Sequence, residues 1–425
     1  MNPKKFFNKK LREEYFFLTH ESGLKIYVFP KRGYSTSCAI IGVKYGSINQ
    51  TYETFSGRKV HTPSGVAHYL EHKLFESEEC DAFSLYAKFG ASANAFTSFD
   101  KTAYYFSCSE KFKDSLKILL DFTQSPYFTP ESVEKEREII TQEINMYYDS
   151  PRNRVTNNLL KCLYKNHPVK NEIAGTVDSI SEITHEILYD SYNNFYNPNN
   201  MSLCLVGDFE VEEMFSFIDK NIKKSEFKPA LTIFPEEPES VFNPRVSEKM
   251  EVASGFFNFG FKEKLEGEFL SMKDVIINDI SLCALTLKSG RLYNRLIDRN
   301  LINVSSFFSE HFNGPYFSSI IFEGNSEYPE EVASIIREEA ENMTRNGIEK
   351  EVFERAKKNV YAESISMLDG VKAISNILLE FSFLGYEIFE FIDKISKIKL
   401  DELNEKIKNK FRGDFSALSV IEPLD

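Results

Sequence analysis

Cysteine is scarce in this sequence and follows no recognisable pattern. The 425 residues contain six cysteines and no tryptophan, and no two cysteines form a Cys-x-x-Cys pair. A chain of this length can bury an ample core without covalent staples. Scattered cysteines in such a chain are typical of free, mostly buried thiols in a reducing compartment. The sequence therefore excludes a miniprotein held together by disulfides.

Long apolar runs are also missing. No stretch of about 18 apolar residues exists, the length that a membrane-spanning helix requires. Near the N-terminus, Lys9, Lys10 and Arg12 interrupt the apolar residues, so no signal-peptide core of roughly 7–15 apolar residues is present. These absences predict a chain that does not span a membrane, with the cytoplasm as its default location.

Positive charge is in deficit. The chain has 51 Lys and Arg against 64 Asp and Glu, a net charge of −13 at pH 7. No basic patch stands out, so binding to a nucleic-acid backbone is not expected. With 42% hydrophobic and 27% charged residues, the composition is that of a soluble globular protein. The length predicts two or three domains.

A pattern of strands, helix, strand and helices occurs twice along the chain. The first copy is expected to contain strands over 25–29, 38–43, 102–108 and 201–206 and helices over 64–75, 112–122 and 129–148. The second is expected to contain strands over 255–261 and 316–322, a helix over 276–299, and further helices from 329 onward.

The repetition indicates two α+β domains related by duplication. The helix expected over 64–75 is matched with 289–301, and the helix over 129–148 with 349–366. A proline-rich segment with little helical periodicity lies between the copies. We therefore expect an N-terminal domain over 1–224, a linker over 225–245 and a C-terminal domain over 246–425.

The sharpest chemical feature is the H-x-x-E-H motif of His68, Glu71 and His72. On a helix, residues four apart share a face, so both imidazoles can reach one metal ion with the carboxylate beside it. Chance predicts roughly 0.02 such motifs in a chain with 7 His and 64 acidic residues. Two unrelated helix histidines beside an exposed glutamate are the alternative. The motif favours a zinc site with a general base.

A third ligand is expected from the helix over 129–148. Glu136 and Glu143 lie two turns apart on a face that also carries Ile139 and Ile140. Carboxylates on an apolar face are costly unless they are paired or bound to a metal. The residue pattern alone does not choose between the two glutamates.

A segment of small and polar residues over 90–98 precedes the strand expected over 102–108. It can form an exposed edge strand that receives a peptide by strand addition. An ordinary loop rich in glycine and serine is the alternative reading.

These features resemble the pitrilysin-type zinc peptidases, or inverzincins, a family that includes insulin-degrading enzyme and mitochondrial processing peptidase. Residues 65–75 resemble the family's zinc helix. Residues 93–98 followed by 102–106 resemble its substrate-binding edge strand, and 136–143 its third-ligand helix. Later landmarks are similar at 175–176, 196–201 and 206–208. The resemblance covers most of residues 20–210.

The resemblance implies a fold, a cofactor and roles for single residues. The fold would be half of a clamshell, two duplicated α+β domains that each contain a mostly antiparallel sheet packed with helices. The cofactor would be one Zn²⁺ per chain. The implied roles are metal ligands at His68, His72 and Glu143, a carboxylate that orients a ligand at Glu136, the general base at Glu71, and peptide binding at Asn94, Ala95 and Phe96.

The second half departs from the family pattern at one informative place. The family holds the substrate backbone with an Arg and a Tyr seven residues apart, and the matching positions here are Ile297 and Val304. Family members that keep zinc but lack this pair usually work with a homologous, zinc-free subunit that supplies it. The expected function is thus the zinc-bearing subunit of a heterodimeric bacterial endopeptidase for unfolded or short peptides. A self-sufficient homodimeric peptidase and a non-catalytic binding or assembly protein are the alternatives.

Overall fold

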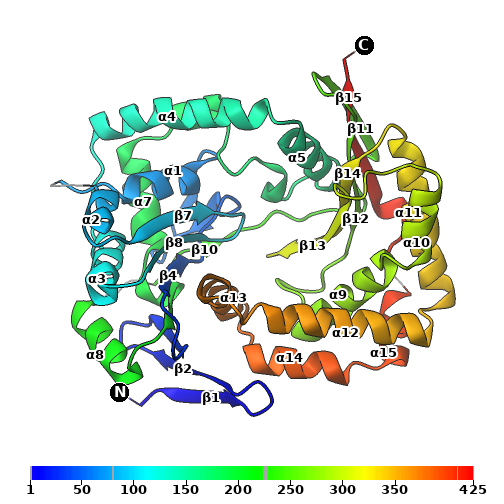
Figure 1. The fold of residues 1–425 in the computed structure, drawn as a ribbon. Coiled ribbons are helices and arrows are strands. Elements are labelled where there is room, and N and C mark those ends of the chain that lie inside the picture. Colours follow the sequence, from blue (N-terminus) through cyan, green and yellow to red (C-terminus); the bar gives the residue numbers. More distant parts are fainter. Residues whose placement is uncertain (1, 79–80, 224–227, 409, 425) are drawn as a thin grey trace. The chain divides into compact units, whose positions relative to one another are not determined.

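The chain folds into two compact units, each built from segments far apart in the sequence (Figure 1). The structure, a computed structural model, describes all residues except 1, 79–80, 224–227, 409 and 425. The first unit comprises Met1–Ile144, Glu172–Ile233 and Ser366–Glu390, and the second comprises Asn145–Asn171, Phe234–Ile365 and Phe391–Asp425. No helix in the described part of the chain is both long and apolar enough to cross a membrane.

A seven-stranded sheet forms the centre of the first unit. Its order is β1 (Lys4–Asn8), β2 (Glu13–Thr19), β3 (Lys25–Pro30), β9 (Met201–Gly207), β4 (Ser37–Val43), β8 (Thr102–Cys108) and β7 (Ser92–Thr97). Only β3 and β9 run parallel among these neighbours. Every residue of β9 is buried, as expected for a central strand covered on both faces. A small sheet joins β10 (Leu231–Thr232), β5 (Thr51–Glu53) and β6 (Lys59–His61).

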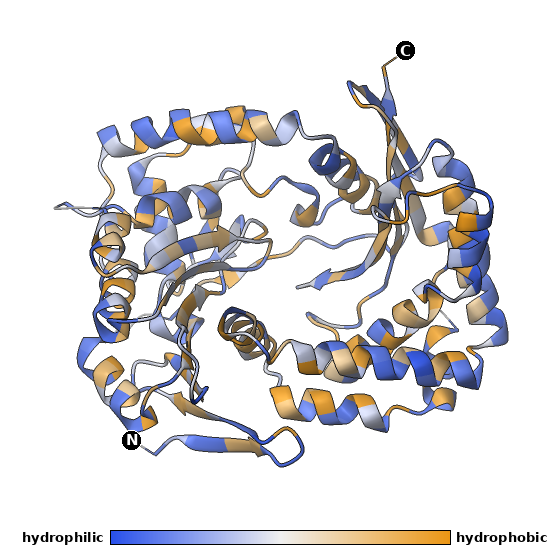
Figure 2. Ribbon diagram, viewed as in Figure 1, coloured by the Kyte–Doolittle hydropathy of each residue, from blue (hydrophilic) through white to orange (hydrophobic). Residues whose placement is uncertain are grey.

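The helices around this sheet come from both ends of the chain. They are α1 (Val66–Leu74), α2 (Ala82–Lys88), α3 (Phe112–Thr123), α4 (Pro130–Tyr148), α6 (Val177–Ser181), α7 (His185–Phe195), α8 (Val211–Asn221) and α13 (Val371–Leu384). Most of α13 is apolar along its length (Figure 2). It packs on the central strands β4 and β9, which explains why so apolar a helix can occur in this chain.

The second unit has a five-stranded sheet in the order β11 (Arg245–Met250), β15 (Ser416–Pro423), β12 (Phe256–Lys262), β14 (Phe317–Asn325) and β13 (Phe308–Gly314). Its helices are α5 (Pro151–Leu163), α9 (Met272–Thr286), α10 (Arg291–Asp298), α11 (Pro329–Asn346), α12 (Lys350–Ser366), α14 (Ile388–Lys397) and α15 (Leu400–Ile407). Short 3₁₀ turns occur at Pro168–Lys170, Pro198–Asn200 and Gly413–Phe415.

The two sheets repeat one topology. The order β3-β9-β4-β8-β7 corresponds to β11-β15-β12-β14-β13, with one parallel pair followed by antiparallel pairs in each. The α+β fold with a duplicated, mostly antiparallel sheet is therefore confirmed. Packing also matches α9 with α1, because α1 lies on β7 and α7 while α9 lies on β13 and α15. The sequence matched 64–75 with 289–301. That match was wrong, because 64–75 contains α1, which corresponds to α9, whereas 291–298 is the next helix, α10.

Each unit takes one helix from the other half of the sequence. Helix α13 covers β4 and β9 in the first unit, and α5 covers β12 and β15 in the second. Glycines allow both close approaches: a Cβ at Gly42 would lie 2.7 Å from Leu379, and one at Gly260 would lie 3.2 Å from Leu159. The contiguous bounds 1–224 and 246–425 therefore differ from these units at residues 145–171 and 366–390.

Several elements differ from expectation. The helix expected over 276–299 is two helices, since α9 ends at Thr286 and Gly290 caps the start of α10. The final strand β15 was not expected. Within the expected linker over 225–245, residues 225–227 lie outside the described residues, and β10 follows at Leu231–Thr232.

Candidate metal centre

Helix α1 is held rigidly against its surroundings. Gly65 precedes it with φ of 95°, a left-handed conformation that suits glycine, and a Cβ there would lie 2.5 Å from the carbonyl oxygen of Ala174. The Tyr69 hydroxyl donates to the carbonyl oxygen of Val133, and Lys73 Nζ donates to that of Ser132 at 3.1 Å. These bonds fix α1 against the first turn of α4.

Three potential ligand atoms converge between α1 and α4. His68 and His72 stand one turn apart, and their Nε2 atoms lie 3.7 Å and 3.4 Å from Oε2 of Glu143. Among the described residues, this is the only group of three whose ligand atoms all lie within 4.8 Å of one another. The structure thus brings together both motif histidines and the later glutamate of the pair two turns apart.

The earlier glutamate reaches the same histidine from its other side. Glu136 Oε1 lies 3.0 Å from His72 Nδ1, so His72 stands between two carboxylates. Burial lowers the pKa of His72, but the hydrogen bonds with Glu136 and Glu143 outweigh it and raise the pKa to about 10. Burial also raises the pKa of Glu136, yet its bond to His72 outweighs that effect and lowers it.

The second histidine is neutral in this arrangement. Burial, and then the nearby charge of His72, lower the pKa of His68 to about 4. Its Nδ1 is buried and has no hydrogen-bond partner. Two imidazole nitrogens and one carboxylate oxygen are donors that suit zinc and leave a fourth position open. The residues present therefore fit a catalytic type of zinc site, in which the ion would replace the proton on His72.

Glu71 lies beside these ligands and is itself buried. Its Oε2 accepts a hydrogen bond of 2.6 Å from the Thr97 hydroxyl. Burial raises the pKa of Glu71, and the bond from Thr97 opposes that shift. Thr97 lies in the segment 93–98 that resembles the family's edge strand, but sequence reasoning gave it no role of its own. Its only signal was its position directly after the segment Asn94–Phe96.

The three residues expected to bind peptide lie on the edge strand β7. Among the described residues this strand pairs only with β8, and its other edge has no strand beside it. Asn94, Ala95 and Phe96 are its central residues, and the Asn94 side chain accepts a hydrogen bond from the Ala95 N–H at 2.8 Å. The open edge ends at Thr97, beside the Glu71 carboxylate.

The positions matched with the family's Arg and Tyr carry exposed apolar side chains. Ile297 and Val304 are 36% and 49% exposed. Neighbouring guanidinium groups are already engaged, because Arg295 pairs with Glu338 and Glu339, and Arg299 pairs with Glu331. The second unit therefore contains no substitute for the clamp at these positions.

Comparison with known proteins assigns both halves of the chain. Residues 36–177 match the family described as "Insulinase (Peptidase family M16)", and residues 182–360 match "Peptidase M16 inactive domain". The zinc protease YmfH of Bacillus subtilis, described as uncharacterized, is 35% identical over 98% of this chain and 98% of its own length.

Solved structures are similar over the full length. One described as an M16-like peptidase from Alicyclobacillus acidocaldarius shares 31% identity with a TM-score of 0.90, over 97% of this chain and 99% of its own. The periplasmic protease PqqL of Escherichia coli shares the fold, with 17% identity and a TM-score of 0.75 over 99% of this chain. This chain corresponds to 48% of PqqL.

Proposed function

Because the chain belongs to peptidase family M16, we propose that it is a zinc-dependent endopeptidase subunit that hydrolyses unfolded or short peptides. The observation that carries this proposal is the convergence of His68, His72 and Glu143 around one point, with a buried carboxylate beside it. Such a set supplies three ligands and a base and leaves an open position for the reaction.

His68, His72 and Glu143 would hold one Zn²⁺, and Glu136 would orient His72. When bound, the ion would polarise the scissile carbonyl and make a water molecule more acidic. Glu71 would accept the proton of that water and transfer it to the leaving amine. Burial favours this role, because it raises the pKa of Glu71 and makes the carboxyl a better proton carrier near neutral pH.

The peptide would bind in an extended form along β7. A peptide added as a strand would form backbone hydrogen bonds with the open edge at Asn94, Ala95 and Phe96. Its binding would then depend little on its side chains. This mode selects substrates whose backbone is free, which means unfolded or short peptides. A folded protein has its backbone groups already paired.

The partner would be a homologous subunit without zinc that supplies the Arg and Tyr. The exposed Ile297 and Val304 support this assignment, since neither side chain can donate a hydrogen bond to a peptide. The cytoplasm stays the location that we propose for the reaction.

The test is Glu71→Gln in the purified chain, assayed on unfolded peptides alone and with a zinc-free homologue. We expect hydrolysis to fall by at least about 10³-fold while bound zinc stays unchanged, because a general base and its activated water are lost together. Glu138→Gln is the matched control, because this glutamate is exposed on α4. Unchanged hydrolysis in Glu71→Gln would contradict the proposed base.

Mixing experiments separate the alternatives. Activity that appears only with the homologue supports the heterodimer, whereas equal activity of the chain alone as a dimer supports a homodimeric peptidase. A wild-type chain that binds no zinc, with His68→Ala behaving identically, would favour a non-catalytic binding protein.

A further inference from the structure

Strand β7 presents every second residue to its open edge. In the turn after β7, the Ser98 N–H donates to the carbonyl oxygen of Lys101 at 2.8 Å, so the backbone of Ser98 faces β8. The backbone groups of successive residues in an antiparallel strand face opposite sides of that strand. The residues of β7 whose N–H and C=O groups face the open edge are therefore Ala93, Ala95 and Thr97.

The central backbone donor of this edge is already occupied. Of the three residues expected to bind peptide, only Ala95 turns its backbone toward the open edge, and its N–H donates to Asn94 Oδ1 at 2.8 Å. No described side chain accepts a hydrogen bond from the N–H of Ala93 or Thr97. The Asn94 side chain is exposed, so it can rotate away from the strand without disturbing the core.

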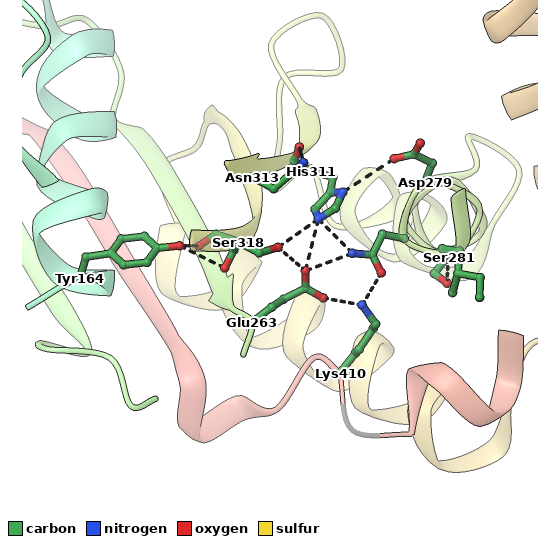
Figure 3. Close-up of polar contacts among 11 residues, drawn as sticks. Tyr164, Glu263, Asp279, Ser281, His311, Asn313, Ser318 and Lys410 are labelled. Carbon is green, nitrogen blue, oxygen red and sulfur yellow. Dashed lines mark hydrogen bonds and ion pairs between the residues drawn. The ribbon is translucent and has the colours of Figure 1, made fainter. Parts of the chain in front are cut away.

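The edge strand of the second unit carries an asparagine in a similar position. Strand β13 lies at the end of its sheet, and the Asn313 amide nitrogen donates to the carbonyl oxygen of His311 at 3.4 Å (Figure 3). The Ser318 carbonyl accepts from the Glu263 N–H at 2.9 Å, so the backbone of Ser318 faces the β12 side. Its partner Asn313, and His311 two residues earlier, therefore face the open edge.

The surroundings of the two edges differ. The His311 imidazole is held by polar contacts, because its Nε2 lies 3.1 Å from the Ser318 hydroxyl oxygen and 2.9 Å from the Asn278 amide nitrogen (Figure 3). Strand β7 instead ends at Thr97, whose hydroxyl donates to the Glu71 carboxylate beside the metal ligands. Displacement of an asparagine from β7 therefore bears directly on the candidate metal centre.

A peptide on β7 has to compete with the Asn94 side chain. A peptide carbonyl that accepts from the Ala95 N–H replaces the Asn94 oxygen, so one hydrogen bond is exchanged for another and little affinity is gained. The gain comes from new backbone bonds at Ala93 and Thr97, on either side of Ala95. The edge therefore selects an extended segment that reaches from Ala93 to Thr97.

We propose that Asn94 is a displaceable mask of the peptide-binding edge. Its side-chain oxygen occupies the Ala95 N–H in the free chain, and a peptide binds by taking its place. Asn94 thus opposes peptide binding, in contrast to the favourable contact that the family resemblance implies at this position. The mask rejects peptides that bond only at Ala95, and it protects an open edge from pairing with other chains. This inference rests on the proposed function, because it places the peptide along β7.

The test measures the affinity of an uncharged, fluorescently labelled, unfolded peptide for the full chain with Glu71→Gln, alone and with the zinc-free homologue. Adding Asn94→Ala should lower the dissociation constant by about 2- to 10-fold, the range expected for one net hydrogen bond. Adding Asn94→Asp should raise it, because a charged oxygen binds the Ala95 N–H more strongly. With Glu71 intact, Asn94→Ala should lower KM and leave kcat unchanged, which a merely structural change would not do.

Asn313→Ala is the matched control, because it removes the same type of side chain from the edge strand of the second unit. It should leave peptide affinity unchanged, and thermal unfolding checks that each variant is folded. Unchanged or weaker peptide binding in Asn94→Ala would overturn the mask while leaving the proposed function intact, as would equal tightening in Asn313→Ala. A chain that binds no peptide in any variant would overturn both the mask and the proposed function.

Discussion

Thr97 links the edge strand β7 to the Glu71 carboxylate. Its hydroxyl has one proton, which goes to Glu71 at 2.6 Å. Thr102 Oγ1 lies 3.4 Å from Thr97 Oγ1 and donates its own proton to the carbonyl oxygen of Tyr45 at 2.8 Å. Thr97 therefore holds the orientation of the Glu71 carboxylate.

Replacing Thr97 by Val should lower kcat by roughly 10- to 100-fold, the effect expected from losing one hydrogen bond to a charged group. KM should change little, because the backbone of β7 is unaltered. Steady-state kinetics on an unfolded peptide, with bound zinc measured in parallel, checks this. Thr97→Ser keeps the hydroxyl and should restore most of kcat. Full activity of Thr97→Val would contradict a role for the hydrogen bond.

His167 is a fully buried histidine of the second unit whose neutral form is fixed by the backbone. Its Nδ1 accepts from the Val169 N–H at 3.1 Å, and its Nε2 donates to the carbonyl oxygen of Pro315 at 3.0 Å. Burial lowers its pKa to about 4. The unfolded chain, with an ordinary pKa of about 6.5, therefore binds more protons between pH 6.5 and 4. Stability is full above pH 6.5 and falls as the pH drops.

This loss should approach roughly 3 kcal/mol at pH 4. Urea unfolding of metal-free protein at pH 7 and pH 4.5, followed by far-ultraviolet circular dichroism, measures it. His167→Gln removes the titrating group, so its free energy of unfolding should depend less steeply on pH than that of the wild type. Identical pH slopes would contradict the lowered pKa.

At the scale of residues, local spacing in the sequence predicted part of the site. Contacts between residues far apart in the sequence could not be predicted. His68, Glu71 and His72 follow from helix geometry alone. Glu136 and Glu143 could not be told apart by spacing because both contact His72, one on each ring nitrogen. The bond from Thr97 to Glu71 spans 26 residues and depends on how β7 docks on α1, which no periodicity encodes.

Among the elements, α1 depends on a single backbone conformation at its start. Gly65→Ala should destabilise the first unit by more than the roughly 1–2 kcal/mol of a left-handed non-glycine residue, because the added Cβ would lie 2.5 Å from Ala174 O. Displacing α1 should also weaken zinc binding. Thermal unfolding and zinc titration measure the two effects.

Gly57→Ala is the matched control for this variant. Gly57 also has a positive φ of 83°, but a Cβ there would meet nothing within 4 Å. It should show the conformational cost alone, with zinc affinity unchanged. Equal effects of the two substitutions on zinc binding would contradict a role for the contact with Ala174.

Strongly periodic elements were predictable, and interrupted ones were not. The strand over 102–108 and the helix over 129–148 were placed within a residue of β8 and α4. The helix expected over 276–299 took no account of Ser289 and Gly290, which lie in the break between α9 and α10. Strand β15 shows no alternation of apolar and polar residues that would have predicted it. It is a strand because it packs between β11 and β12.

For the whole molecule, the exchange of α5 and α13 makes each half of the sequence incomplete. A fragment over 1–245 lacks α13, so the apolar face of β4 and β9 beneath it would be exposed to water. We expect this fragment to aggregate or to bind a hydrophobic dye strongly, and to bind zinc weakly. Adding a fragment over 246–425, which supplies α13, should restore a soluble complex. A well-folded fragment 1–245 with full zinc affinity would contradict this expectation.

Duplication was predictable from the repeated pattern, because both halves show the same order of strands and helices. The exchange was not, because the helical patterns of α5 and α13 do not state which sheet each helix covers. The packing of these helices in the structure identifies their partners, including the close contacts of Gly42 with Leu379 and of Gly260 with Leu159.

The exchange of α5 and α13 also means that the first sheet is covered only late in synthesis. The last strand of the first sheet, β9, ends at Gly207, whereas α13 ends at Leu384. At about 5–20 residues per second, a ribosome needs roughly 10 to 35 s to produce the intervening chain. During that time the apolar face of the first sheet under α13 stays uncovered, so we expect the nascent chain to expose apolar surface that a chaperone could bind. Mutations that slow translation of the second half should reduce the yield of a correctly folded first unit.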